Sequence, residues 1–308
     1  MAKSIIGNAI QHAKRGDLLP WINRSISWKI DGVRYPEEGA RRRIRQEQLF
    51  SSLLSAYAPI ISNEIKPRYG LINKTIWILW LQGENNAPAL VKSCTRSMRK
   101  MFPEWKIVYL TEENLQGYVH FPAYINDLWR EHCFGAAHYS DLIRADILAS
   151  YGGLWADATV LCTAPNLLNS VSSLPLFCFK EMNLQRGIHQ PIVASSWLIY
   201  ARPGSQILSL TRDLLFEYWK DHRFLSEYFL FHIFFAIACE RYSDEWESVP
   251  LFNNHSPHVL QFEFDHIYSS DRWKQILGFS DFHKLNHHIN YENCGNHPTF
   301  YDYVVSHY

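Results

Sequence analysis

Short apolar runs alternate with helical patterns between residues 74 and 163, and this alternation restricts the fold more than any other feature of the chain. The apolar runs are KTIWILWLQG (74–83), WKIVYLT (105–111) and LWADATVLC (154–162), the last broken at a polar centre. The helical patterns lie at 86–102, 121–133 and 136–153, where a Gly-Gly pair ends the third. Continuous apolar runs suit strands buried on both faces, so the alternation predicts an α/β layer with a mixed, mostly parallel sheet.

The rest of the chain extends this layer. Two further strands are expected in PLFCFKE (175–181) and PIVASSWLIYA (191–201), and two long helices at 204–222 and 227–242. Residues 1–70 have a different, helical character, which predicts an N-terminal helical extension (1–70) followed by one catalytic domain (71–308).

Four arginines, Arg41, Arg42, Arg43 and Arg45, precede an apolar stripe on the helix expected within the extension. They form either a solvated basic turn or a peripheral contact with anionic lipid headgroups. The apolar runs are all shorter than the ~20 residues that span a bilayer, and the N-terminus has no secretory pattern. Together with cysteines that form no C-x-x-C pair, this predicts a cytoplasmic protein with reduced thiols. Lys and Arg (30) balance Asp and Glu (30), which argues against a nucleic-acid partner.

Asp141 and Arg144 lie on one face of a helix whose other residues are apolar nearly all round. Charges on a buried helix need partners, because their desolvation is costly. Two interpretations remain open: the two residues satisfy each other as a structural pair, or they line a polar cavity where Asp accepts from sugar hydroxyls and Arg donates to an oxygen-rich ligand.

Asp157 follows a predicted strand, at the carboxyl edge where open α/β sheets bind ligands. Sites that hold a divalent metal on a pyrophosphate often present Asp-x-Asp, whereas here the motif is Asp157-Ala158-Thr159. One carboxylate suffices for Mg²⁺ or Mn²⁺, which take few carboxylates beside substrate phosphates. Thr159 would face the same side of a strand as Asp157. The alternative for Asp157 is an acid that caps a turn.

Several segments together resemble the bacterial capsular polysaccharide synthesis proteins, which are related to the DXD-containing sugar transferases of glycosyltransferase family 32. They are IWILWLQGENNAPALVKSC, KIVYLTEEN, AAHYSDLIRADILASYGGLWADATVLCTAP, EYFLFH and FHKLN, in that order. The resemblance implies a GT-A fold, a nucleotide-diphosphate sugar donor, Mn²⁺ or Mg²⁺, and transfer with retention of configuration. Asp-Ala-Thr departs from the Asp-x-Asp of the wider group but occurs in the capsule-type branch.

The resemblance also implies roles for individual residues. Asp141 and Arg144 would bind the donor sugar, Asp157 the metal and diphosphate, and Thr159 would take the second motif position. Gln82 and Trp80 would lie beside the nucleotide. Late in the chain, His283 would complete the metal site and Lys284 would neutralise the leaving diphosphate, with His287-His288 as the local competitor.

Glu227 and Glu181 are the candidates for catalysis on the acceptor side, although Glu227 is equally explained as an acid at a helix N-terminus. With retention, either the diphosphate oxygen takes the acceptor proton or a carboxylate forms a covalent intermediate. The sequence thus predicts a glycosyltransferase that acts on a growing capsular or related glycan, free or lipid-linked. A degraded sugar-binding protein on the same fold and a glycoside hydrolase are the alternatives.

Overall fold

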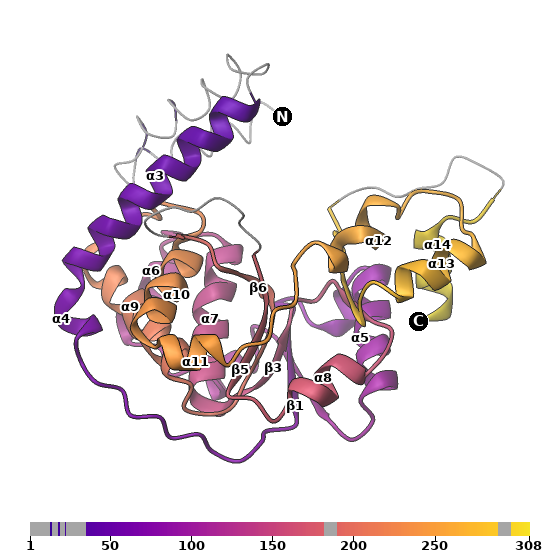
Figure 1. Cartoon of the computed structure of the whole chain (residues 1–308), viewed down its shortest axis with the longest axis horizontal. Coiled ribbons are helices and arrows are strands. Elements are labelled where there is room, and N and C mark those ends of the chain that lie inside the picture. Colours follow the sequence, from indigo (N-terminus) through magenta and orange to yellow (C-terminus); the bar gives the residue numbers. More distant parts are fainter. Residues whose placement is uncertain (1–12, 14–17, 19–21, 23–34, 182–189, 289–296) are drawn as a thin grey trace.

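A computed structural model of the chain describes residues 35–181, 190–288 and 297–308, together with residues 13, 18 and 22. Its centre is a five-stranded sheet in the order β2-β1-β3-β6-β5 (Figure 1). The strands are β1 (Thr75–Leu79), β2 (Lys106–Leu110), β3 (Gly153–Ala156), β5 (Leu176–Lys180) and β6 (Ala194–Ala201). β2, β1 and β3 are parallel, and β6 runs antiparallel between β3 and β5. The mixed sheet predicted from the alternating pattern is confirmed.

Helices cover both faces of this sheet, as Figure 1 shows. The longer helices are α5 (Ala89–Met101), α6 (Ala123–Arg130), α7 (Ala136–Tyr151), α9 (Gln206–Asp221) and α10 (Leu230–Arg241). The largest apolar cluster joins α6, α7, α9 and α10 to one face, and a second joins α5 and α8 (Asn166–Val171) to the other. Short helices in the connections are η1 (Glu84–Asn86), η2 (Leu115–Gly117), α11 (Ser243–Glu247) and η3 (Ser256–His258). None of the helices in the described ranges is both long and apolar enough to cross a membrane.

A small second sheet pairs the centre of the chain with its late part. β4 (Val160–Cys162) and β7 (Phe282–Lys284) are antiparallel, with Val160 opposite Lys284. A third apolar cluster joins β4 and α5 to α12 (Val259–Phe262), α13 (Ser270–Leu277) and α14 (Phe300–His307). β3 and β4 lie on either side of residues 157–159, so the expected break at the polar centre of this segment is confirmed.

The predicted N-terminal helical extension contains α3 (Tyr35–Ala56) and α4 (Ala58–Ile61), followed by a long segment that leads to β1 (Figure 1). Phe50 on α3 is completely buried in the largest apolar cluster, and α3 contacts α10. The second half of α3 therefore shares the core of the sheet domain, although the boundary at residue 70 stays a prediction.

Gly152 and Gly153 make the sharp turn from α7 into β3. Their φ angles are +64° and +96°, values that side chains disfavour. A Cβ atom on Gly153 would lie 2.5 Å from the carbonyl oxygen of Thr75 on the neighbouring strand. The indole of Trp77 donates a hydrogen bond of 2.8 Å to the carbonyl of Gly152, which fixes the turn from the β1 side. The glycine pair thus allows β3 to approach β1 closely.

Replacing Gly153 by alanine is expected to lower the free energy of unfolding by more than the roughly 1–2 kcal/mol that a left-handed backbone costs alone, because the new Cβ would also meet a backbone oxygen. Urea denaturation monitored by tryptophan fluorescence measures this. Gly117→Ala is the matched control, since a Cβ there meets nothing within 4 Å. Equal unfolding midpoints for the two variants would contradict the close approach.

Candidate functional site

Asp157 lies at the carboxyl edge of the parallel strands, as predicted. Trp77 of β1 is opposite Trp155 of β3, so the same register places Asp157 beside the end of β1. The backbone N–H of Asp157 donates to the carbonyl of Trp197 on β6, at 2.8 Å. The residue is therefore held by β6 beside the end of β1, at the position where open α/β sheets bind ligands.

A chain of alternating charges runs through Asp157. The guanidinium of Arg144 donates from Nη1 to Asp141 and from Nη2 to Asp157 Oδ1, at 3.0 Å. The ammonium of Lys284 donates to Asp157 Oδ2, also at 3.0 Å. The order is therefore Asp141, Arg144, Asp157, Lys284. Asp141 and Arg144 satisfy each other and are joined to the polar edge through Asp157. Neither is among the residues that line the cavity at this edge, so their role as lining residues stays a prediction.

Burial and neighbouring charges shift the pKa values of Asp141 and Asp157 in opposite directions. Burial raises the pKa of Asp157, but Lys284 and Arg144 outweigh this effect, and the net pKa is lowered. Burial raises the pKa of Asp141 to about 6, and the attraction of Arg144 offsets this only in part. Asp157 is thus firmly ionised at neutral pH, whereas Asp141 titrates not far below it.

Of these four charged residues, Arg144 is the most enclosed, with a side chain only 4% exposed. Its guanidinium carbon lies 5.0 Å from the ring centroid of Trp155, and that indole also donates to Asp157 Oδ1 at 3.1 Å. The Nε–H of Arg144 is buried and has no hydrogen-bond partner among the described residues. An unpaired buried donor on a cation is costly, and this N–H is closed to solvent and lies outside the lining of the cavity.

Lys284 reaches Asp157 from the small sheet. Its ammonium also donates to the hydroxyl of Thr159, at 2.8 Å, and Leu285 N–H donates to the carbonyl of Thr159, at 2.9 Å. The pairing of β4 with β7 therefore fixes the lysine stem on the backbone of the motif itself. The structure brings together Asp141, Arg144, Asp157, Thr159 and Lys284, all of which the sequence placed at the donor.

His283 is turned away from Asp157. Successive side chains of a strand point to opposite faces, so His283 lies on the other side of β7 from Lys284. Its ring is completely buried, and Nε2 lies 3.2 Å from the hydroxyl of Thr163. Burial lowers the pKa of His283 to about 4. The structure therefore does not bring this imidazole to the predicted metal.

The remaining donors do not fit a divalent metal either. Both carboxylate oxygens of Asp157 already accept hydrogen bonds from cations, and the Thr159 hydroxyl is engaged by Lys284. Within the described parts of the chain, no three His, Cys, Asp or Glu side chains lie together as a metal site. Mn²⁺ or Mg²⁺ would have to enter beside an ammonium and a guanidinium, against their repulsion.

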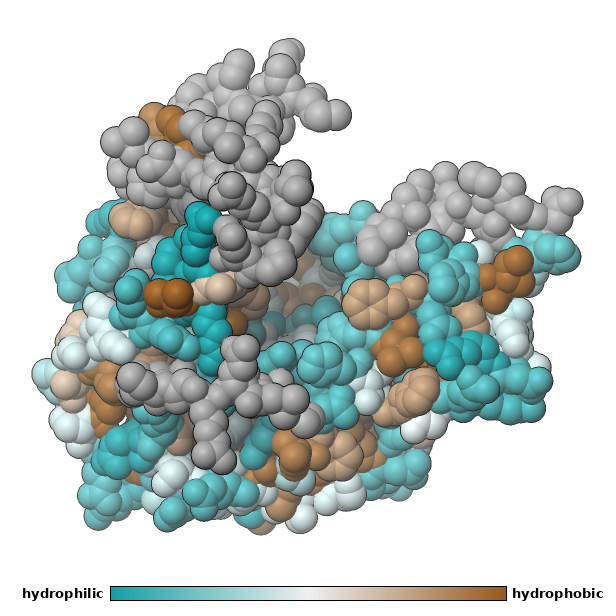
Figure 2. All heavy atoms as spheres, turned by 45° about the horizontal axis from the view of Figure 1, so that its top comes forward, coloured by the Kyte–Doolittle hydropathy of each residue, from teal (hydrophilic) through white to brown (hydrophobic). Residues whose placement is uncertain are grey.

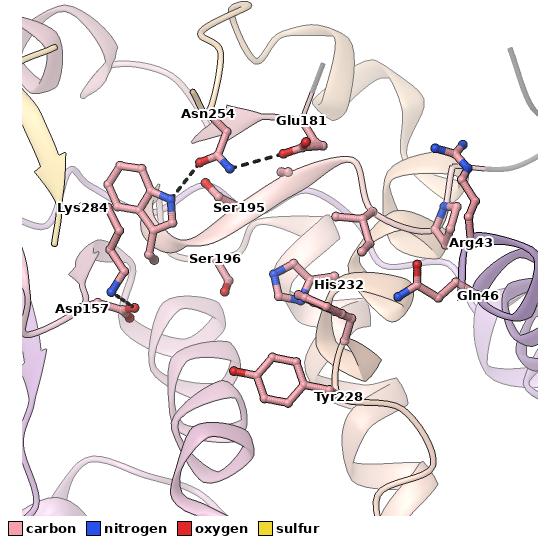
Figure 3. A pocket seen from close by; sticks show the side chains of 15 residues that line it. Arg43, Gln46, Asp157, Glu181, Ser195, Ser196, Tyr228, His232, Asn254 and Lys284 are labelled. Atoms are coloured by element: carbon pink, nitrogen blue, oxygen red, sulfur yellow. Dashed lines mark hydrogen bonds and ion pairs between the residues drawn. The ribbon is translucent and has the colours of Figure 1, made fainter. Parts of the chain in front are cut away.

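A cavity of about 710 Å³ opens from Asp157 and Lys284 toward α3. Figure 2 shows the corresponding face of the molecule hollowed near its middle. In Figure 3 the Asp157–Lys284 pair lies at one end, Ser195 and Ser196 lie between, and Arg43 and Gln46 of α3 lie at the other end. A volume of this size suits a small-molecule ligand.

The two glutamates predicted for catalysis lie in different places. Glu181 follows β5 and lines the cavity, where it accepts a hydrogen bond of 3.3 Å from the amide of Asn254. Glu227 does not open a helix, because α10 begins only at Leu230. It instead accepts from Gln46, at 3.3 Å, and thereby ties α3 to the turn before α10. The structure thus brings Glu181 to the cavity but gives Glu227 a linking contact.

Trp80 and Gln82 follow β1 at the same sheet edge, outside the lining of this cavity. Gln82 is exposed. Trp80 is half-buried, lies edge-on to His287 with ring centroids 5.1 Å apart, and has a buried Nε1–H without a partner among the described residues. Their predicted place beside the nucleotide is compatible with this position and stays a prediction.

His232 is the principal lining residue to which the sequence assigned no role. It lies on the first turn of α10 and faces the cavity (Figure 3), with Nδ1 buried and unpartnered among the described residues. Burial, reinforced by the charge of Arg144, lowers its pKa to about 3, so the imidazole is neutral. A lone polar residue in the apolar run at 228–238 was the available signal. Ser195, Ser196 and Asn254 gave no signal. The antiparallel β6 brings the two serines here, and Asn254 is held by the backbone of Lys180 and the indole of Trp197.

Comparison with known proteins gives two partial likenesses and one match over most of the chain. A segment of 145 residues, 44% of this chain, is 30% identical to the "O-glycosyltransferase braB" of Annulohypoxylon truncatum, and it spans only 32% of the length of that protein. A solved structure, "PaToxG Glycosyltransferase", is 15% identical and covers 65% of this chain and 80% of its own, with a TM-score of 0.36. Residues 39–304 match the family of capsular polysaccharide synthesis proteins, nearly the whole described chain from α3 to α14. The chain belongs to the capsular polysaccharide synthesis protein family.

Proposed function

We propose that this protein is a glycosyltransferase that moves a sugar from a nucleotide-diphosphate donor to a hydroxyl group of a glycan, on a GT-A arrangement. The observation that supports this most directly is the charge chain from Asp141 to Lys284 at the end of an open cavity. Family membership and the partial match to an O-glycosyltransferase support glycosyl transfer in general.

The reaction needs negative charge to be stabilised where the donor breaks. The acceptor oxygen forms a bond to the anomeric carbon, and the bond from that carbon to the diphosphate oxygen breaks, with its electron pair passing to the oxygen. The acceptor proton passes to the departing diphosphate. Lys284 and Arg144 are the cations beside the proposed diphosphate position, and they are preoriented by Asp157 and Thr159.

The donor sugar would lie against α7. Asp141 would accept from sugar hydroxyls, and the positive charge of Arg144, which is bonded to both Asp141 and Asp157, would attract the phosphate oxygens. The acceptor would occupy the cavity toward α3, where Glu181, His232 and the serines of β6 offer hydrogen-bonding groups. Retention of configuration is part of the proposal, and NMR of the first-formed product would determine it.

The glycoside hydrolase alternative fits the site less well. A hydrolase needs two carboxyl groups that act independently as acid and base or nucleophile. Asp141 and Asp157 are instead joined by one guanidinium, and Asp157 is held on its other oxygen by Lys284. The second alternative is a protein that binds sugars on this fold without catalysis, and turnover of a nucleotide sugar would exclude it.

A cytoplasmic location with a glycan or lipid-linked acceptor is proposed, with no role for nucleic acid. Of the arginines predicted to contact a membrane, Arg42 lies 3.8 Å from Glu227 and 4.7 Å from the ring centroid of Phe229. Arg43 pairs with Glu47 and lines the cavity. These two arginines therefore contact the protein itself, and the contact through Arg41–Arg45 stays a prediction.

Asp157→Asn is expected to reduce transfer by about 10²-fold or more, because the anion that orients both cations is lost. Release of nucleotide diphosphate from a panel of nucleotide sugars, with a glycan acceptor, measures this. Asp127→Asn is the control, since the carboxylate of Asp127 is exposed and, among the described residues, its recorded partner is Arg130 on the surface. Normal turnover by folded Asp157→Asn protein would refute the role of this carboxylate.

The pH dependence of donor use should follow the ionisation of the Asp141 carboxylate. Its pKa is raised to about 6, so the carboxylate is ionised above that pH and protonated below it. We expect kcat/KM for the donor to fall as pH decreases through about 6, and Asp141→Asn to be slow at every pH without that decrease.

Stability gives a second readout for the same variant. Because the folded state raises the pKa of Asp141, ionisation of this group disfavours folding as pH rises through about 6. The thermal midpoint of Asp141→Asn at pH above 7 should therefore be no lower than that of the wild-type protein. A markedly lower midpoint would identify Asp141 as a structural residue.

A further inference from the structure

The ammonium group of Lys284 stands between the two side chains that the sequence motif offers to a metal. It lies 3.0 Å from Asp157 Oδ2 and 2.8 Å from Thr159 Oγ1, in contact with both oxygens at once. A cation that bridges a carboxylate and a hydroxyl on one motif does what a bound metal ion would do there. Here the cation belongs to the protein.

The opposite side of Asp157 is also closed to an additional cation. Oδ1 accepts from Arg144 at 3.0 Å and from the Trp155 indole at 3.1 Å. A divalent ion that bound this carboxylate would need to displace an ammonium or a guanidinium, and a hydroxyl of Thr159 is a weaker replacement for the carboxylate of Asp-x-Asp. The motif and its partners thus match each other: the motif has one carboxylate and one hydroxyl, and the ammonium of Lys284 bonds to both.

The lysine is a fixed part of the scaffold. β7 pairs with β4 in a register that sets Lys284 opposite Val160, and the backbone of Leu285 is bonded to that of Thr159. Its side chain is 21% exposed and that of Asp157 is 26% exposed, so the pair faces the cavity. An ammonium has three N–H donors, and two are used by Asp157 and Thr159. Among the described residues the third N–H has no recorded partner, and it is the group that would donate to an oxygen of the donor diphosphate.

We propose that Lys284, supported by Arg144, supplies the positive charge on the donor diphosphate in place of a divalent metal, so that donor binding and transfer proceed without added Mn²⁺ or Mg²⁺. This rests on the proposed function. Lys284 would act on the leaving group as the anomeric C–O bond breaks, by stabilising the charge on the departing oxygen, while the lysine keeps its proton throughout.

The direct test is calorimetric titration of the wild-type protein with UDP and with GDP, in excess EDTA and again in excess MnCl₂. We expect the nucleotide that binds to show the same Kd in both solutions. Tighter binding by about tenfold or more in MnCl₂ would overturn the proposal while leaving the glycosyltransferase assignment intact. Failure of both nucleotides to bind in either solution, with no turnover of any nucleotide sugar, would refute the proposed function and the inference with it.

Variants of Lys284 provide a second test of the proposal. Lys284→Met keeps the stem and removes the charge, and it is expected to weaken nucleotide diphosphate binding in EDTA by about tenfold or more. Lys284→Arg should recover part of that loss. Lys180→Met is the matched control, because Lys180 is also a strand-end lysine, and its ammonium lies over the ring of Trp246 rather than at the cavity. Unchanged binding by Lys284→Met in EDTA would overturn the proposal, whatever its thermal stability.

Discussion

The guanidinium of Arg144 is the interaction on which the rest of the site depends. It is buried in a helix whose neighbours are apolar, where an unpaired charge would destabilise the fold by several kcal/mol. Its two carboxylate partners come from its own helix and from the end of β3. The need to neutralise one arginine therefore fixes the position of α7 relative to the sheet edge, and it keeps Asp157 ionised in a mostly buried place.

The second cation reaches the same carboxylate by a different route. Lys284 is carried by a short strand that pairs with β4, and the cluster around α12, α13 and α14 supports that strand. The site thus depends on two apolar cores at once, one beneath α7 and one beneath the small sheet. Rigid support from two sides lets like-charged groups stay close together around a single anion.

Much of the fold could be predicted, because a buried strand and a buried helix have distinct apolar patterns. The strands, their break at Asp157 and the buried charges of α7 all followed from such patterns. The positions of His283 and Glu227 did not follow from these apolar patterns. In a strand, only one of two neighbours can face the site, and the sequence did not show whether this was His283 or Lys284. The helix predicted at 227–242 begins only at Leu230, because the sequence does not distinguish the turn at 228–229 from a first helical turn. His232 and Ser195 required the antiparallel placement of β6 and the packing of α10, which are long-range features.

The cavity is built from chain segments that are far apart in sequence. One end is formed by the Asp157 motif and β7, whereas α3 closes the other with Arg43 and Gln46. The bonds around Asp157 come from Arg144, Lys284, Trp155 and Trp197, and Arg43 and Gln46 bond instead to Glu47 and Glu227. If the proposed transfer is correct, substitutions on the cavity-facing side of α3 would alter which acceptor binds, whereas the buried side of the same helix, with Phe50, is constrained by the core.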